Sequence, residues 1–251
     1  MRLKVLTIDF WNTLFDSSGG TERNNYRLAA FIKEADKYGI QFKADDFNEA
    51  IKKSWEYFNN IWKNDMRTPS PYESAEFFWK NLKLPYDKDS IKTLSEEFGN
   101  AILVNPPKLI EGVKDSLEIL SKKFKLGIVS DTGFSPGTVL RKLLEKNSII
   151  SYFDAFSFSN ETGVSKPHPI AFMTVLNNFG CNPEEALHIG DIEQTDIEGA
   201  KKLGMKAIRF KGDTSYPLTP EREEFTIADA EAESWSEIVE LINNLSKKII
   251  T

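Results

Sequence analysis

The chain has 251 residues, of which 40% are hydrophobic and 12% aromatic, enough for one large α/β domain or for a medium domain carrying a smaller one. A net charge of −6 argues against non-specific nucleic-acid binding, which requires a basic surface. The single cysteine, Cys181, excludes an intramolecular disulfide, and no apolar run reaches 18 residues, so we expect a cytoplasmic protein without membrane spans.

Short apolar runs that end in small or acidic residues recur along the chain. They are KVLTID (4–9), FKLGIVSD (124–131), AFSFSN (155–160), ALHIGD (186–191) and KAIRF (206–210). Helical patterns over 113–123, 138–146, 169–179 and 196–203 separate the later runs. Strands that alternate with helices predict an α/β fold with a parallel sheet. Ligands of such sheets bind beyond the carboxyl ends of the strands, so the residues ending these runs should converge there: Asp9, Ser130, Asp131, Asn160, Gly190 and Asp191.

The stretch between the first and second runs is too long for one crossover and shows helical periodicity. Five large apolar residues, mostly aromatic, recur in it at spacings of three and four: Phe47, Ile51, Trp55, Phe58 and Trp62. They favour an amphipathic helix whose stripe packs in a core, although it could line a substrate pocket instead. With Pro106 and Pro107 as a stiff hinge, we predict an inserted all-helical cap domain over 17–106 on a core formed by 1–16 and 107–251. The tail EFTIADAEAESWSEIVELINNLSKKII predicts one more strand edge and a closing helix, with Trp235 as a core anchor.

Four short motifs occur in a fixed order in this framework: DFWNTLFD, IVSD, SKP and GDIEQTD. Together they resemble the motifs of the haloacid dehalogenase-like hydrolase superfamily. The helical insertion and the stretch SNETGVSKPHPIAF are similar to its branch with a helical cap. The resemblance covers almost the whole chain, and it implies a Rossmann-like core and a hydrolase.

The catalytic residues are predicted from this resemblance and from their own chemistry. A carboxylate at a strand end can attack phosphorus, and the resemblance assigns this role to Asp9. Ser130 offers a hydroxyl and a backbone N–H to a phosphoryl oxygen, and the Lys166 ammonium offsets charge on the nucleophile and the transferring group. The predicted substrate-binding residues are Trp11, Asn12, Ser130, Asp131 and Lys166.

A Mg²⁺ site is the predicted cofactor site. Mg²⁺ prefers one or two carboxylates together with waters and substrate oxygens, which Asp9 and Asp191 would supply. The resemblance adds the backbone carbonyl of Trp11. Asp196 would bind through water or orient Lys166, while an N-cap of the following helix is a competing use. Glu193 could add negative charge there, although a position on the solvated surface is the favoured prediction.

Trp11 is the departure from the family pattern, because phosphatases of this superfamily usually carry a second Asp there as general acid and base. Three enzymatic interpretations follow. One is a Mg²⁺-dependent hydrolase of a small phosphorylated metabolite, with an acid from Asp16, Asp131 or Glu161 or with a leaving group that needs no proton. Another is a 2-haloacid dehalogenase, in which a bulky aromatic residue at this position is usual but the acidic residue at the position of Asp191 is typically absent. The third is a phosphonatase that uses Lys52 or Lys53.

A non-catalytic binder of a phosphorylated ligand also stays open, although a binder has no need of Asp9. His168 lies beside the Lys166 loop, and His188 is predicted as a core residue. We predict the Mg²⁺-dependent hydrolase, with a small-molecule partner and neither a nucleic acid nor a membrane. The sequence leaves the oligomeric state open.

Overall fold

The computed structural model describes residues 3–213 and 225–247, and the chain divides into two compact units. The core unit comprises Met1–Ser18, Pro107–Asp131 and Leu144–Thr251, and the helical unit comprises Gly19–Pro106 and Thr132–Leu143. The predicted boundaries of the insertion did not include the second segment of the helical unit. Among the described helices, none is both long and apolar enough to cross a membrane.

The core unit contains a six-stranded sheet in the order β3-β2-β1-β4-β5-β6, and all its strand pairs are parallel. The strands are β1 (Val5–Ile8), β2 (Lys125–Ser130), β3 (Ala155–Phe158), β4 (Ala186–Gly190), β5 (Lys206–Phe210) and β6 (Ala230–Ala232). The predicted α/β parallel sheet is confirmed. Strand β1 lies between β2 and β4, so the residue that follows it stands at the centre of the sheet edge.

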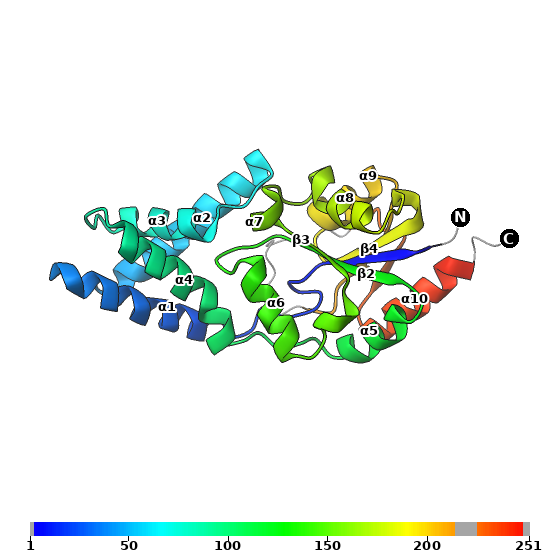
Figure 1. Ribbon diagram of the computed structural model, residues 1–251, viewed down its shortest axis with the longest axis horizontal. Coiled ribbons are helices and arrows are strands. Elements are labelled where there is room, and N and C mark those ends of the chain that lie inside the picture. The colour runs from blue at the N-terminus through cyan, green and yellow to red at the C-terminus, as the bar shows by residue number, and fades with distance from the viewer. Residues whose placement is uncertain (1–2, 214–224, 248–251) are drawn as a thin grey trace. The chain divides into compact units, whose positions relative to one another are not determined.

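Helices cover both faces of this sheet, which explains why β1, β2 and β4 read as nearly continuous apolar runs. Figure 1 shows α8 and α9 on one face and α5 and α10 on the other. After residue 106 the helices and short turns are α5 (Val113–Ser121), α6 (Gly137–Lys146), η2 (Ile150–Tyr152), α7 (Ser159–Thr162), α8 (Pro169–Asn178), η3 (Pro183–Glu185), η4 (Glu193–Ile197), α9 (Glu198–Lys202) and α10 (Trp235–Lys247). Most of α6, residues 137–143, belongs to the helical unit.

The C-terminal prediction of a strand edge and a closing helix corresponds to β6 and α10. Trp235 is fully buried, and its indole N–H donates to the carbonyl of Thr13 at 2.8 Å, so its prediction as a core anchor is confirmed. Glu224 and residues 248–250 of the predicted tail lie outside the described residues.

The helical unit contains α1 (Gly20–Ala35), η1 (Asp36–Tyr38), α2 (Ala44–Asp65), α3 (Pro71–Asn81) and α4 (Lys88–Val104). Its core is aromatic, with Phe31, Phe47, Phe78, Trp79 and Phe98 all buried. The stripe predicted on α2 divides: Phe47 and Ile51 enter this core, whereas Trp55 is 39% exposed. The ring of Trp55 instead lies 5.3 Å from that of Phe134, in the segment Thr132–Leu143.

Asp229 provides a testable contribution to the stability of the core unit. Its carboxylate accepts hydrogen bonds from the backbone N–H of Ala207 at 2.9 Å and from Lys201 Nζ at 2.8 Å, which fixes the start of β5. Burial acts to raise the pKa of Asp229, but these two donors outweigh it and hold the pKa below its ordinary value. A depressed pKa stabilises the fold above the ordinary pKa, and this stabilisation is lost as the pH falls through the folded value.

We therefore expect Asp229→Asn to lower the free energy of unfolding by about 1–2 kcal/mol at pH 7. The difference from the wild type should narrow below about pH 4, where the unfolded carboxyl is protonated. Urea unfolding at pH 7 and pH 3 measures both values. The control is Asp154→Asn, which removes an exposed carboxylate paired with Lys125 at 3.3 Å and should change stability by less than about 0.5 kcal/mol. A constant difference at both pH values would contradict this assignment.

Candidate active site

The carboxyl ends of β1, β2 and β4 bring three of the predicted site residues to one edge of the sheet. Asp9 follows β1, Ser130 ends β2 and Asp191 follows β4. The backbone N–H of Asp9 donates to the carbonyl of Ile189 at 2.9 Å, which ties the first of these positions to β4. Asp9 and Ser130 are buried, and Asp191 is half-buried.

Lys166 is the cation at this edge. It lies in the turn before α8, is 3% exposed, and its ammonium donates to Asp9 Oδ1 and, at 2.6 Å, to Asp196 Oδ1. Its backbone N–H donates to Asp131 Oδ1 at 3.0 Å. Carboxylates therefore hold both the backbone N–H and the ammonium of Lys166. The contact with Asp196 is the one expected if Asp196 orients Lys166.

The charges at this edge do not balance among the protein's own groups. Three carboxylates, from Asp9, Asp191 and Asp196, have oxygens within 4.8 Å of one another, and Lys166 is the cation that contacts two of them. Burial raises the pKa of Asp9 to about 7, and the carboxylate of Asp196 adds to the rise against the opposing charge of Lys166. Burial and the neighbouring carboxylates likewise raise the pKa of Asp191.

The other two charges at this edge stay ionised. Burial would lower the pKa of Lys166, but the carboxylates of Asp196 and Asp9 outweigh it and raise the pKa instead. The pKa of Asp196 is held low, since Lys166 and His188 outweigh its burial. The site therefore stabilises the ionised form of Asp196, whereas the charges of Asp9 and Asp191 are not balanced by Lys166.

This charge excess fits a divalent cation. Carboxylate oxygens are the hard ligands that Mg²⁺ prefers, and Asp191 is further positioned by Asn12, whose Nδ2 donates to its Oδ2 at 3.3 Å. Asp196 is less available to a metal ion, because both of its oxygens already have partners. Its Oδ1 contacts Lys166 and His188, and its Oδ2 accepts a hydrogen bond from the backbone N–H of Ile192 at 3.1 Å. The residues present thus suit an ion held directly by Asp9 and Asp191.

The interpretation of Asp196 as the N-cap of the following helix is wrong. The chain forms a wide turn, η4, before α9 begins at Glu198, and the carboxylate of Asp196 reaches back to Ile192. Gly190 makes room for this geometry, since a Cβ there would lie 2.3 Å from Asp196 Cγ. The Gly-Asp pair after β4 thus has a steric reason.

His188 and Thr7 support the site in a way that the sequence did not indicate. His188 is buried in β4, and its imidazole contacts Thr7 Oγ1 at 2.8 Å and Asp196 Oδ1 at 2.9 Å. Burial lowers the pKa of His188, which favours the neutral ring. The sequence predicted His188 only as a core residue. Its contact with Thr7 depends on the pairing of positions 7 and 188 across β1 and β4, which no local sequence pattern indicates.

Trp11 and Asn12 form the turn that follows Asp9. Trp11 is half-buried and its ring meets that of Phe10 edge to face at 5.2 Å. Asn12 adopts a left-handed backbone with φ of 53°, and its N–H donates to the carbonyl of Phe15 at 2.7 Å. Asn12 thus has a role beside Asp191, in addition to the substrate contact predicted for it.

Glu193 corrects a second prediction, because it is buried rather than solvated. Its carboxylate accepts from Arg209, from the Thr226 hydroxyl at 2.6 Å and from the Ile227 N–H at 2.8 Å. It therefore joins η4 to β5 and to the segment that precedes β6.

The three acidic residues that could replace the missing general acid differ in their hydrogen bonds and in their exposure. Asp16 accepts from Ser18 and from the Lys108 backbone N–H at 2.8 Å, so its carboxylate holds the loop together. The carboxylate of Asp131 holds the backbone of Lys166. Glu161 is exposed on α7.

Two lysines and one histidine that the sequence singles out have local contacts of their own. Lys52 and Lys53 are exposed on α2, where they pair with Glu56 at 4.0 Å and Glu49 at 3.6 Å, as surface lysines commonly do. His168 caps α8, where its Nδ1 accepts from the Ile170 N–H at 3.2 Å.

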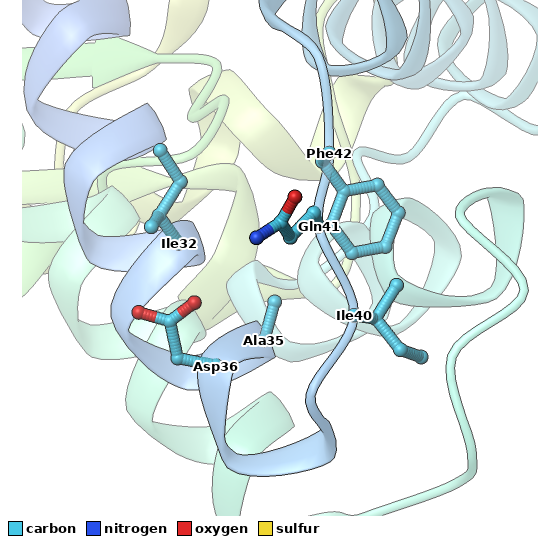
Figure 2. Close-up of a pocket in the computed structure, with 6 residues that line it drawn as sticks. All are labelled: Ile32, Ala35, Asp36, Ile40, Gln41 and Phe42. Carbon is cyan, nitrogen blue, oxygen red and sulfur yellow. The ribbon is translucent and has the colours of Figure 1, made fainter.

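The helical unit has a small pocket of its own, with a volume of about 190 Å³ (Figure 2). Three of its lining residues, Ile32, Ala35 and Asp36, lie at the end of α1 and the start of η1. The others belong to the following loop: Ile40, Gln41 and Phe42. None of the predicted site residues lines it.

Comparison with known proteins decides the family. The family model described as haloacid dehalogenase-like hydrolase matches residues 39–210, more than half of the chain. The chain belongs to the haloacid dehalogenase-like hydrolase family. The predicted resemblance is thereby confirmed, and the protein is a hydrolase of this family.

Several relatives of this hydrolase are phosphatases by name. Glyceraldehyde 3-phosphate phosphatase from Pyrococcus furiosus is 27% identical over 252 residues, covering 99% of this chain and 98% of the relative. Human N-acylneuraminate-9-phosphatase is 25% identical over 224 residues, covering 82% of this chain and 81% of the relative.

Solved structures of the family share the fold of this hydrolase. The magnesium-bound HAD-hydrolase YfnB from Bacillus subtilis aligns with a TM-score of 0.65 at 19% identity, covering 97% of this chain and all of that one. A 2-haloacid dehalogenase from Pseudomonas syringae aligns with a TM-score of 0.68 at 21% identity, covering 97% of this chain and 99% of that one.

Proposed function

We propose that this hydrolase is a Mg²⁺-dependent phosphatase that acts on a small phosphorylated metabolite through an aspartyl-phosphate on Asp9. The observation that carries the proposal is the cluster of Asp9, Asp191 and Asp196 around the Lys166 ammonium at the end of β1. Full-length similarity to named phosphatases supports the reaction class.

The metal would be held by Asp9 and Asp191 directly, by Asp196 through water and by the backbone carbonyl of Trp11. When bound, Mg²⁺ offsets the negative charge of the phosphoryl oxygens and keeps both aspartates ionised.

The protein's own groups perform the transfer. A carboxylate oxygen of Asp9 attacks phosphorus, the bond from phosphorus to the bridging oxygen of the substrate breaks, and the leaving group departs with that oxygen and the electron pair. Lys166, held by Asp196, stabilises the charge on the transferring group, and the Ser130 hydroxyl and N–H bind a phosphoryl oxygen. Water then hydrolyses the aspartyl-phosphate and regenerates Asp9.

Trp11 defines the substrates that this site can process rapidly. An indole transfers no proton at neutral pH, and general acid–base catalysis contributes about 10²–10⁴-fold. Of the three acids considered above, Asp16 and Asp131 already hold backbone groups, and Glu161 is exposed on α7. We therefore propose a leaving group of low pKa, such as that of an acyl phosphate or a phosphoanhydride.

Hydrolysis of p-nitrophenyl phosphate with and without Mg²⁺ tests this function, because its leaving group needs little protonation. A series of aryl phosphates then tests the role of Trp11, since the rate should fall steeply as the leaving-group pKa rises. Equal rates across the series, or turnover that is independent of the metal, would exclude the proposal.

Restoring a carboxylate at position 11 should raise turnover. We expect Trp11→Asp to increase the hydrolysis of phenyl phosphate by about 10²-fold, the lower end of the range for general acid–base catalysis. p-Nitrophenyl phosphate should gain much less, because it needs no acid. Trp11→Phe serves as the control, since it removes the indole without adding a carboxyl. A similar gain in both variants would show that loss of the indole, and not the new acid, is responsible.

A 2-haloacid dehalogenase is the second candidate, and Trp11 is the observation that favours it. Chloride leaves without a proton, so this reaction needs no acid at that position. The excess negative charge around Asp191 weighs against it, because a carboxylate substrate would be repelled unless a cation is bound. Release of chloride from 2-chloropropionate distinguishes the two reactions.

We further propose that the helical unit is the cap domain of this family and that the enzyme works in the cytoplasm on a small molecule. The single cysteine supports a reducing compartment.

A further inference from the structure

The carboxylate of Asp196 lies close enough to those of Asp9 and Asp191 to share an ion with them, but it already has other partners. One oxygen from each of the three carboxylates lies within 4.8 Å of the other two. Asp196 Oδ1 accepts from the Lys166 ammonium at 2.6 Å and contacts His188 Nε2 at 2.9 Å. Proximity alone would therefore make Asp196 a third direct ligand of a metal, and its hydrogen bonds oppose this.

The second oxygen of Asp196 has partners as well. Its Oδ2 accepts from the backbone N–H of Ile192 at 3.1 Å and from the hydroxyl of Thr195 at 3.4 Å. An ionised carboxyl group has about four acceptor positions, so these four donors together leave Asp196 little capacity for direct coordination. The contact with Thr195 is the longest, and its hydroxyl can give way to a metal-bound water.

His188 is the donor on Oδ1 that Asp196 does not share with Asp9, since the Lys166 ammonium donates to Asp9 as well. The imidazole is fully buried, and its Nδ1 contacts Thr7 Oγ1 at 2.8 Å. Its ring also meets that of Phe172 edge to face at 5.1 Å. These contacts fix the ring, so Nε2 is held in place beside Asp196.

The direction of this hydrogen bond follows from the chemistry of the two partners. An ionised carboxylate only accepts hydrogen bonds, so Nε2 of His188 carries the proton that points toward Asp196. The Thr7 hydroxyl can donate to Nδ1 of a neutral ring or accept from a charged one. The donation from His188 to Asp196 is therefore the same in both charge states of the ring.

We propose that His188 is a positioning residue that keeps Asp196 on Lys166 and out of direct contact with the metal, so that the site prefers Mg²⁺ to Ca²⁺. This role rests on the metal site of the proposed function. Mg²⁺ retains several waters and is bound through one or two carboxylates, whereas Ca²⁺ takes about six to eight oxygen ligands. A third carboxylate released toward the ion would therefore favour Ca²⁺.

Calorimetric titration of the metal-free protein with MgCl₂ and with CaCl₂ tests this role without any substrate. We expect the wild type to bind Mg²⁺ more tightly than Ca²⁺. In His188→Leu, the Ca²⁺ dissociation constant divided by that of Mg²⁺ should fall by about tenfold, the lower end of the effects of groups that orient metal ligands. His188→Gln should restore most of this ratio, because its side-chain amide can donate from the place of Nε2.

Two further variants separate positioning from a general loss of stability. Thr7→Val removes the hydroxyl that contacts Nδ1 of His188 but keeps the size of the side chain, so the ratio should fall by a smaller factor. Val175→Ala truncates a fully buried side chain of α8 in an apolar core cluster of the same unit, and it should keep the wild-type ratio.

The wild type alone can overturn the proposal, whether or not the His188 variants fold, because tighter binding of Ca²⁺ than of Mg²⁺ would contradict it. An unchanged ratio in folded His188→Leu would also contradict it, and so would an equal fall in Val175→Ala. If the wild type binds Mg²⁺ and only these ratios fail, the role of His188 is wrong and the proposed function stands. Binding of neither ion by the wild type would contradict the metal site of the proposed function together with the role of His188.

Discussion

Replacing Asp9 by Asn is expected to reduce the Mg²⁺-dependent hydrolysis of p-nitrophenyl phosphate by about 10⁴-fold or more. Removal of a nucleophile that acts in concert with its neighbours has effects of this order. Asn is close in size to Asp, so the position at the end of β1 is preserved. The change also removes one of the two direct ligands proposed for the metal.

The control for this variant is Asp154→Asn, at an exposed carboxylate of the same unit, which should keep full activity. Circular dichroism and urea unfolding establish that Asp9→Asn is folded. A folded Asp9→Asn protein with more than about a tenth of the wild-type rate would show that another group attacks phosphorus.

The second large effect is expected at Lys166. Replacing Lys166 by Met should lower the free energy of unfolding by about 3–5 kcal/mol at pH 7 in metal-free buffer, because it leaves buried carboxylates without their cation. Lys166 holds the pKa of Asp196 below its ordinary value, so its contribution is present above that ordinary value and is lost as the pH falls. The difference from the wild type should therefore shrink toward pH 3. Urea unfolding at the two pH values measures it.

Two variants accompany Lys166→Met. Lys166→Arg keeps the charge and should recover part of the loss. Lys122→Met removes an exposed lysine that pairs with Glu118 at 2.9 Å and should change stability by less than about 0.5 kcal/mol. A loss below 1 kcal/mol in Lys166→Met would contradict the picture of a buried charge cluster.

The strands and their ends were predictable because their signal is local. Each predicted strand is a short apolar run that stops at a polar residue, and parallel strands carry those ends to one edge, which is where Asp9, Ser130 and Asp191 lie. The motif order added Lys166, which no local pattern would distinguish from a loop lysine.

The predictions were wrong where a tertiary contact or an unusual turn determines the position of a side chain. Glu193 and Asp196 follow β4 in a stretch predicted to run from the strand into an ordinary helix, but the wide turn η4 directs both carboxylates inward. The hydrogen-bond partners of Glu193, such as the Arg209 side chain and the backbone N–H of Ile227, lie well downstream in the chain. Phe134 is a similar case, since nothing in the loop after β2 indicates that it joins the aromatic side chains of the helical unit.

The most direct test of the account is to detect the phosphorylated form of Asp9. The enzyme is mixed with p-nitrophenyl phosphate and Mg²⁺, quenched in acid within the first turnovers, and its peptides are weighed by mass spectrometry. Because Trp11 provides no base to activate water, the aspartyl-phosphate should accumulate, and the peptide containing Asp9 should carry one added phosphoryl group. Turnover at a measurable rate with no phosphoryl group on that peptide, or with the group on another residue, would contradict the account.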